Sequence, residues 1–304
     1  MPRPPRRPNQ MTTRHWKDIL EEFLKFKLLN GIAKSTRDDY VRTVNLLLKR
    51  YPNAWDSYYN LEEAVIQHLN QEGIAPATFN SRLTYLRTFF NWCMEKGYLK
   101  KNPLTNIKKR KEGSRIVAIS IETLQELIKA PDQSTFVGMR DYTLIILTLD
   151  TGIRPSEALA LQPNDFNLIS GWVRIPDAAA KTRVSRTLNI SPVTIDALNR
   201  FISMRPRSWG NKVTVFSTEA GNALNRHVWG DRLERHSKQV GVHITPYALR
   251  HAFALEFLRN GASAFSLQKT LGHVDISMTK RYVALADEDL KKDHAKASPL
   301  NKLT

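Results

Sequence analysis

Apolar positions in the first hundred residues recur at the spacing of helices and are separated by short polar loops. Ser35, followed three residues later by Asp38, resembles a capping box, and Val41, Val44 and Leu48 then recur at helical spacing. We therefore predict a helix that begins at this serine.

A second apolar stripe lies in IAPATFNSRLTYLRTFFNWCMEKGYL, where Pro76 suits the first turn of a helix and Gly97 suits its end. The stripe itself consists of Phe79, Leu83, Leu86 and Phe90. Polar side chains project from other faces of the two helices: Arg37, Asn80, Arg82 and Arg87. For each arginine, a solvated helix face is the alternative to a binding role.

The segment KKNPLTNIKKRKEGSR has no hydrophobic periodicity and contains four consecutive basic residues, 108–111. Such composition is typical of a linker. We predict a flexible basic arm over residues 1–13, a helical domain over 14–100, a linker over 101–115 and a second domain over 116–304.

The second half begins with helical patterns in SIETLQELIKA and in RDYTLIILTLDTG, which Gly152 closes. Another helix is expected at IRPSEALALQ, with Pro155 early in it and Glu157 in its first turn. GWVRIP and RVSRTLNI read as the two strands of a hairpin whose turn region carries Lys181. Residues from about 223 to 296 read as mainly helical, so we predict a mainly α fold with a small β-hairpin.

Charge narrows the possible partners. The formal net charge is +17, with a sequence pI of about 10.0, which favours a polyanion: nucleic acid first and an anionic membrane surface second. No apolar run approaches the roughly 20 residues that span a bilayer, and MPRPPRRPNQ lacks the apolar core of a secretory signal. Cys93 is the only cysteine, which excludes an intramolecular disulfide and suits a reducing cytoplasm.

A basic protein that acts on phosphodiesters must neutralise the charge that accumulates on the non-bridging oxygens, with metal ions or with arginines. No obvious Asp, Glu or His cluster for two metals is present, which favours chemistry without a metal. Arg154 follows Gly152 at an expected helix start, where backbone N–H groups also favour an anion. The alternative for this arginine is an ion pair with Glu157.

Arg250 lies in TPYALRHAFALEFLRNG, where Thr245 can cap a helix that Pro246 opens. Tyr247 and Arg250 are then three residues apart on one face, and a surface helix arginine is the alternative. His273 follows a glycine at an expected turn and can donate to a phosphate oxygen or carry a proton, although a lone histidine is more often a satisfied polar residue.

Tyr282 lies in the helical stretch that follows. A phenol can form a covalent phosphodiester once cations stabilise its phenolate. The alternative is a helix tyrosine that packs beside Met278.

Taken in order, TGIRPSEALALQPNDF, the hairpin lysine, TPYALRHAFALEFLRNG and LGHVDISMTKRYVAL resemble the tyrosine recombinase (phage integrase) family over nearly all of residues 115–290. The helical first half is similar, less specifically, to the family's core-binding domain. The resemblance implies a two-domain, C-shaped clamp around DNA, with an α+β catalytic domain.

By this resemblance, Arg154 and Arg250 hold the scissile phosphate, Lys181 protonates the leaving 5′-oxygen, and His273 is the second-box histidine. Tyr282 is then the nucleophile that forms a 3′-phosphotyrosine link. The covalent link conserves the energy of the phosphodiester bond, so the resemblance implies no ATP, no metal and no other cofactor.

One position departs from the family pattern. Where the family usually has His-x-x-Arg, this sequence has Tyr247 three residues before Arg250. A tyrosine hydroxyl can donate a similar hydrogen bond but carries no positive charge, which puts rate and pH dependence in question. His251 is not by default the histidine displaced from this pattern, because family members commonly have a histidine after this arginine as well, and His243 is a nearby candidate with little support.

The resemblance further implies a tetramer on double-stranded DNA, with no membrane or small-molecule partner and with action on the cytoplasmic nucleoid. Arg37, Asn80, Arg82 and Arg87 are the expected DNA contacts. We expect integration of a mobile element, with Xer-like dimer resolution as the alternative role. A DNA-binding accessory protein without catalysis and a topoisomerase are the alternative activities.

Overall fold

The computed structural model divides the chain into two compact units, residues 1–113 and 114–304. The part of the chain that it describes comprises residues 12, 14–113, 118–180, 184–273, 275–276, 278–286, 294 and 298. Each unit has its own hydrophobic core.

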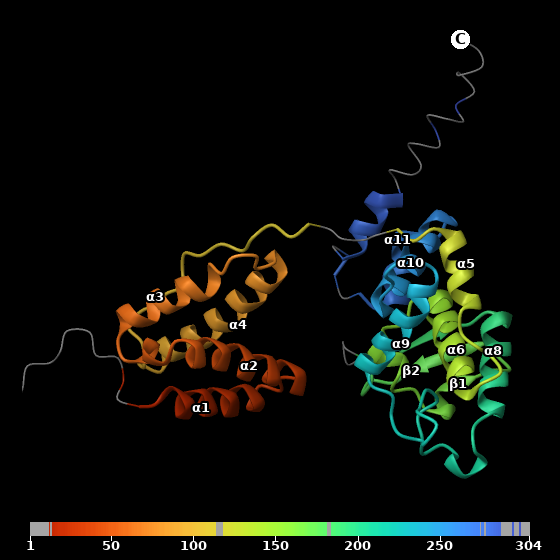
Figure 1. Cartoon of the computed structure of the whole chain (residues 1–304), viewed down its shortest axis with the longest axis horizontal. Helices are drawn as coiled ribbons and strands as arrows, with labels where there is room; N and C mark the ends of the chain where they lie inside the picture. Colours follow the sequence, from red (N-terminus) through yellow and green to blue (C-terminus); the bar gives the residue numbers. More distant parts are fainter. Residues whose placement is uncertain are drawn as a thin grey trace, which may run out of the picture. The chain divides into compact units, whose positions relative to one another are not determined.

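Helices build the first unit, drawn in red to yellow in Figure 1. They are α1 (Trp16–Leu29), α2 (Lys34–Arg50), the 3₁₀ turn η1 (Pro52–Trp55), α3 (Tyr58–Leu69) and α4 (Pro76–Glu95). Pro76 is the first residue of α4, and Gly97 follows the helix with φ of 75°, as predicted. The predicted stripe of α4 is buried.

The predicted capping box was wrong. α2 begins at Lys34 after the extended residue Ala33, with no side-chain cap, so Ser35 lies inside the first turn. The residues of this turn are mostly exposed, and water can satisfy their N–H groups without a side-chain acceptor.

Much of the segment predicted as a linker packs against α4 instead. Leu104 is fully buried in the first core, and Asn102 donates to the Arg87 carbonyl at 3.1 Å. The Asn80 side chain pairs with both the N–H and the C=O of Arg110, each at 2.8 Å. Among the described residues of this segment, Leu104 is the one fully buried apolar residue, and side-chain hydrogen bonds supply much of the rest, which is why a search for hydrophobic periodicity missed it.

The second unit combines helices with a small sheet (Figure 1). Its helices are α5 (Ile121–Lys129), α6 (Phe136–Thr151), α7 (Pro155–Ala158), α8 (Pro192–Ser203), α9 (Arg226–Gln239), α10 (Pro246–Arg259) and α11 (Ala264–Leu271), with the 3₁₀ turns η2 (Pro163–Asp165) and η3 (Arg207–Trp209). Residues 278–286 are also helical.

The strands β1 (Phe166–Asn167), β2 (Trp172–Ile175) and β3 (Arg186–Asn189) form an antiparallel sheet in that order, with Val173 opposite Leu188. The predicted hairpin is thus confirmed, with β1 as an additional strand. The mainly helical fold with a small sheet is confirmed as well. The clamp around DNA stays a prediction.

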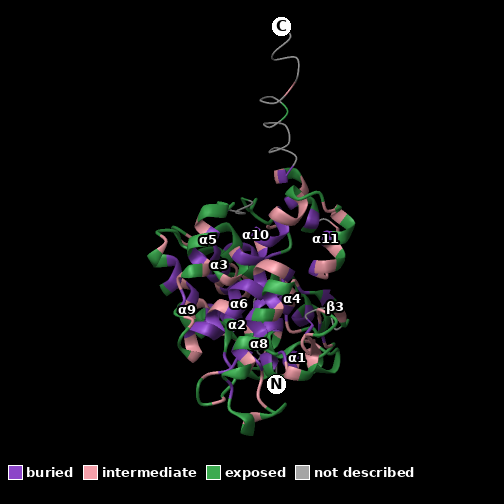
Figure 2. Ribbon diagram, turned by 90° about the vertical axis from the view of Figure 1, so that its right-hand side faces the viewer, coloured by how far each residue is buried: buried purple, intermediate pink, exposed green. Residues whose placement is uncertain are grey.

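α6 forms the centre of the second unit, and Figure 2 colours it largely as buried. It packs against both α8 and α10. Its Asp141 is fully buried and accepts hydrogen bonds from Arg140, from Arg232 Nε at 2.7 Å and from His236 Nε2 at 3.0 Å. Burial alone would raise the pKa of Asp141, but His236 and Arg140 outweigh it and lower the pKa. The network ties α9 to α6.

Within the described residues, no helix is both long and apolar enough to cross a membrane.

Candidate active site

Two helices of the second unit end in glycines with left-handed backbone conformation. α6 ends at Gly152 and α11 ends at Gly272, each with φ of 61°. A Cβ at Gly152 would lie 2.3 Å from Cδ1 of Phe253, so the position admits no side chain. Helix C-termini carry unpaired carbonyls with partial negative charge. The carbonyls at these two helix ends are therefore available to accept hydrogen bonds from side chains of other elements.

Arg250 of α10 is held by such carbonyls. Its Nη1 donates to the Gly152 carbonyl at 2.6 Å and its Nη2 to the Leu271 carbonyl at 2.9 Å. The residue is buried, and no carboxylate of the described residues forms an ion pair with it. Burial first, and then the charge of Arg154, lower its pKa to about 10, so it stays charged at neutral pH.

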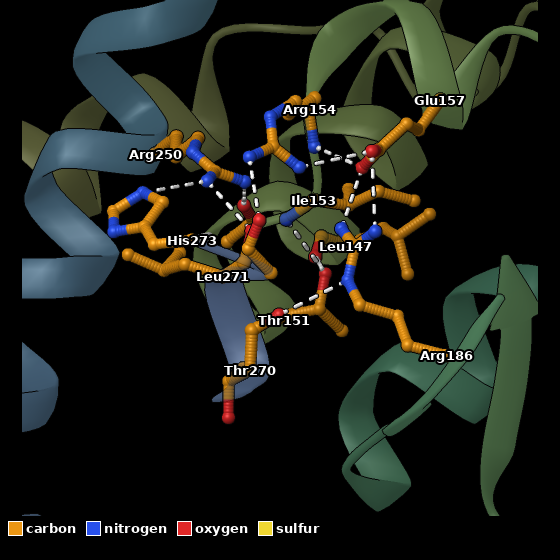
Figure 3. A network of polar contacts seen from close by, with 12 residues as sticks. Leu147, Thr151, Ile153, Arg154, Glu157, Arg186, Arg250, Thr270, Leu271 and His273 are labelled. Atoms are coloured by element: carbon orange, nitrogen blue, oxygen red, sulfur yellow. Dashed lines mark hydrogen bonds and ion pairs between the residues drawn. The ribbon is translucent and has the colours of Figure 1, made fainter. Parts of the chain in front are cut away.

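Arg154 lies at the N-cap of α7, and Figure 3 shows its guanidinium between Glu157 and the α11 end. It donates to Glu157 Oε1 and to the Gly272 carbonyl, both at 3.0 Å. The ion pair named as the alternative role is therefore present alongside the contact to α11. The backbone N–H of Arg154, expected to favour an external anion, donates to Glu157 Oε2 at 3.2 Å instead.

Arg186 of β3 completes this group, and the sequence reasoning missed it. It donates to both oxygens of Glu157, at 3.1 and 2.6 Å, and its Nε to the Thr270 carbonyl at 3.3 Å (Figure 3). Strand alternation places Arg186 on the same face as the buried Leu188, a signal that could have indicated an inward-facing arginine.

Arg154 and Arg186 contact the single carboxylate of Glu157, and Arg250 adds a third guanidinium to the cluster, which leaves two positive charges in excess. Burial alone would raise the pKa of Glu157, but Arg186 first and then Arg154 lower it, so the carboxylate stays ionised. The excess positive charge of the cluster can therefore stabilise a bound anion with one or about two negative charges.

His273 connects Arg250 to the following helix. Its Nε2 lies 3.1 Å from Arg250 Nη2, which can only donate, so Nε2 is the acceptor. Its Nδ1 lies 3.0 Å from Thr279 Oγ1 and carries the proton in this tautomer. Burial, and then the charges of Arg250 and Arg154, lower the pKa of His273 to about 4, which keeps it neutral.

Tyr282 is 4% exposed and belongs to a hydrophobic cluster with Phe253, Leu267 and Leu271, whereas Met278 is 54% exposed. Its hydroxyl lies 2.5 Å from Nδ1 of His251, the residue directly after Arg250. Burial raises the pKa of the phenol, against the charges of Arg250 and Arg281. The tyrosine is thus protonated at neutral pH.

Three further candidates from the sequence are Lys181, Tyr247 and His243. Lys181 is outside the described residues, so its assignment stays a prediction. Tyr247 lies one turn before Arg250 but is 53% exposed, whereas Arg250 is buried. His243 is exposed and lies before α10.

The residues expected to contact DNA differ in whether their polar groups are already hydrogen-bonded within the first unit. Arg37 is exposed on α2. Asn80, Arg82 and Arg87 instead use their polar groups within the first unit: Asn80 on Arg110, Arg82 on the His68 carbonyl at 3.1 Å, and Arg87 on the Leu104 carbonyl at 3.2 Å. Their role in DNA binding stays a prediction.

Across the described residues, no group of three or more His, Cys, Asp or Glu side chains is placed to hold a metal ion. The polar cluster instead offers paired arginines for a phosphate-like anion, with a histidine and a buried phenol attached to the same elements. Paired arginines beside a buried phenol are the groups that a protein needs to bind a phosphoryl group and attack it with a tyrosine.

The chain belongs to the phage integrase family, whose sequence pattern matches residues 118–289. It is 29% identical over 292 residues to the tyrosine recombinase XerD of Lacticaseibacillus casei, covering 92% of this chain and 98% of the relative. It is 30% identical over 247 residues to the tyrosine recombinase XerC of Pelotomaculum thermopropionicum, covering 77% of this chain and 79% of the relative. The prediction of a site-specific tyrosine recombinase is confirmed at this level.

Solved structures share the fold. The Tn1549 transposon integrase in complex with transposon right end DNA superimposes with a TM-score of 0.71 at 17% identity, covering 92% of this chain and 98% of that one. A lambda integrase tetramer bound to a Holliday junction gives a TM-score of 0.71 at 16% identity, covering 90% of this chain and 78% of that one.

Proposed function

We propose that this protein cleaves and rejoins DNA strands at a specific site, with Tyr282 forming a 3′-phosphotyrosine intermediate. The observation that carries the proposal is the cluster of three buried or nearly buried arginines around a single carboxylate. Arg154 shares Glu157 with Arg186, and Arg250 is held by helix-end carbonyls that do not neutralise it, so the cluster keeps an excess of positive charge. A scissile phosphate supplies the missing negative charge.

In this mechanism Arg154 and Arg250 bind the non-bridging oxygens, and their positive charge stabilises the five-coordinate transition state. Tyr282 Oη attacks phosphorus, and the bond from phosphorus to the 5′-oxygen breaks. Lys181 protonates the leaving 5′-oxygen, and His273, held by Arg250 and Thr279, adds a polar contact to the phosphate. The free 5′-hydroxyl of another strand then attacks the phosphotyrosine in reverse.

The phosphotyrosine link conserves the energy of the phosphodiester, so the reaction requires neither ATP nor a metal. Arginines meet the charge demand that metal ions would otherwise meet.

Tyr247 lies near the solvent-exposed start of α10, where a DNA backbone can approach it. We assign its hydroxyl a hydrogen bond to the phosphate in place of the family's usual histidine. This bond is neutral, so it adds binding without adding charge.

The partner is double-stranded DNA, which the net charge of +17 favours, and the working form is a tetramer clamped on two duplexes. Because the substrate is DNA, the place of action is the nucleoid in the cytoplasm. Exposed Arg37 is the first candidate for a backbone contact in the first unit.

Integration of a mobile element is the proposed role, supported by the likeness in fold to the Tn1549 transposon integrase. A Xer-like role in dimer resolution is the second candidate, because the match to XerD covers 98% of that relative.

Covalent trapping on DNA tests the activity. Nicked duplexes with randomised flanking sequence are incubated with the protein, and the products are run on a denaturing gel. We expect a protein–DNA band that Tyr282→Phe abolishes, and sequencing of its DNA identifies the cleavage site. If DNA binds without a Tyr282-dependent band, the accessory DNA-binding function replaces this proposal, and Tyr247→His becomes the variant to test for restored cleavage.

A further inference from the structure

The hydroxyl of Tyr282 has a titratable partner that the sequence analysis left without a role. Nδ1 of His251 lies 2.5 Å from Tyr282 Oη, and the two rings are 5.7 Å apart between centroids at an interplanar angle of 40°. His251 is the residue directly after Arg250 in α10. The contact therefore joins the proposed nucleophile to the helix that carries a phosphate-binding arginine.

The protonation states at neutral pH place the proton on the tyrosine and leave the histidine free to accept it, although transfer is uphill until a phosphorus–oxygen bond begins to form. Burial first, and then the charge of Arg250, lower the pKa of His251, so its imidazole is neutral at pH 7. The phenol of Tyr282 is protonated, because burial raises its pKa. A hydroxyl donor thus faces an imidazole nitrogen that is free to accept.

The other histidine of the site is not placed for this task. Both ring nitrogens of His273 are engaged, Nε2 with Arg250 at 3.1 Å and Nδ1 with Thr279 at 3.0 Å. Among the described residues, His251 is the titratable side chain that contacts the reacting oxygen directly.

We propose that His251 is the general base that accepts the phenolic proton of Tyr282 during cleavage and returns it during rejoining. The inference rests on the function proposed above. As the bond from Tyr282 Oη to phosphorus forms, the proton passes to His251 Nδ1, while the bond to the 5′-oxygen breaks and that oxygen takes its proton from the acid, for which Lys181 is proposed. In the reverse step the phenol leaves phosphorus and recovers its proton from His251.

The charged neighbours of His251 favour a reversible transfer. Arg250 lies beside His251 on α10, and Tyr282 faces it from the 278–286 helix. A charge on His251 would also lower the pKa of His273. Once protonated, the imidazolium is repelled by Arg250, which favours return of the proton. Arg281, on the same helix as Tyr282, stabilises the developing phenolate.

Single-turnover cleavage on the duplex identified by trapping tests the proposal. His251→Asn keeps a hydrogen-bonding group near the position of Nδ1 but cannot accept a proton. We expect this variant to bind the duplex normally and to cleave about 10²–10⁴ times more slowly, the usual contribution of a general base. The wild-type rate should rise with pH through the pKa of His251, below 6.5, and the variant should lose this dependence.

A substrate whose scissile 5′-oxygen is replaced by sulfur separates the base from the acid, because a thiolate leaves without protonation. The sulfur substrate should restore cleavage by Lys181→Ala but not by His251→Asn. The matched control is His227→Asn, at an exposed histidine on α9, which should cleave at the wild-type rate.

Three results for His251→Asn overturn the proposal while leaving the proposed function intact. The first is a Tyr282-dependent band formed at the wild-type rate, and the second is a faster rate, which would mean that the contact restrains the tyrosine. The third is rescue of this variant by the sulfur substrate. Absence of a Tyr282-dependent band in the wild type would instead refute the proposed function. Thermal unfolding of His251→Asn, with His251→Gln as the second variant, establishes that a slow rate belongs to a folded protein.

Discussion

Arg186→Met tests whether the charge balance around Glu157 holds the site together. Glu157 is fully buried and receives two hydrogen bonds from Arg186, at 2.6 and 3.1 Å, against one side-chain bond from Arg154 at 3.0 Å. Methionine keeps much of the apolar stem of arginine but removes the charge. The substitution therefore leaves a buried carboxylate with half of its charged partners.

Removing one partner of a buried ion pair costs about 3–5 kcal/mol. Because Glu157 keeps Arg154, we expect the lower end, about 3 kcal/mol. In a unit of this size that loss lowers the melting temperature by roughly 6–12 °C. Arg200→Met is the matched control, since Arg200 is half exposed and lies 3.9 Å from Asp196, a surface pair worth at most about 1 kcal/mol.

The pH dependence gives a second, independent readout. In the wild type the pKa of Glu157 is below its ordinary 4.5, so its stabilising contribution is present above that value and is lost as pH falls through the folded pKa. In Arg186→Met, burial outweighs the remaining partner and the pKa rises. The stability difference between the two proteins should therefore be largest near neutral pH and should shrink as Glu157 protonates.

Thermal unfolding followed by circular dichroism at pH 7 and at several lower values measures both effects. A destabilisation no larger than that of Arg200→Met, or one that stays constant with pH, would refute the assigned charge balance.

Three further outcomes are expected. Gly152→Ala should destabilise the second unit by about 1–3 kcal/mol in urea unfolding, because its Cβ would overlap Phe253 at a backbone φ of 61°; an unchanged midpoint would contradict this. Leu104→Ala should destabilise the first unit by about 2–5 kcal/mol, measured by its thermal transition, whereas a free linker would show no change. Arg37→Gln should lower the salt dependence of DNA binding by about one phosphate contact in filter-binding or anisotropy titrations, and an unaltered slope would remove it from the interface.

Local rules predicted the parts of the fold that depend on local chemistry. Gly152 at the end of α6, Pro76 at the start of α4 and the hairpin between β2 and β3 follow from backbone conformation and alternation. The packed segment before residue 113 could not be predicted in this way, because Leu104 and Asn102 reach a core built by residues elsewhere in the chain.

Local sequence likewise predicted some residues of the candidate site and missed others. Arg154, Arg250, His273 and Tyr282 were found because each lies in a recognisable local motif. Arg186 contacts Glu157, 29 positions away in the sequence, and His251 contacts Tyr282, 31 positions away. These contacts exist only in the folded chain. Residues in a local motif can be identified from family resemblance, whereas residues defined by long-range contacts can be identified only from the folded structure.

The two arginines proposed to bind the phosphate are held in different ways, and this difference has consequences for substitution. Arg154 is oriented by the side chain of Glu157 together with the Gly272 carbonyl, whereas Arg250 is oriented by the main-chain carbonyls of Gly152 and Leu271 and has no carboxylate partner among the described residues. Carbonyls at helix ends carry only partial charge, so they fix the guanidinium without neutralising it. Arg250→Lys would keep the charge but lose the planar fork that spans the two carbonyls, and with it the link between the ends of α6 and α11. The geometry around Arg250 thus depends on the backbone path through Gly152 more than on any partner side chain.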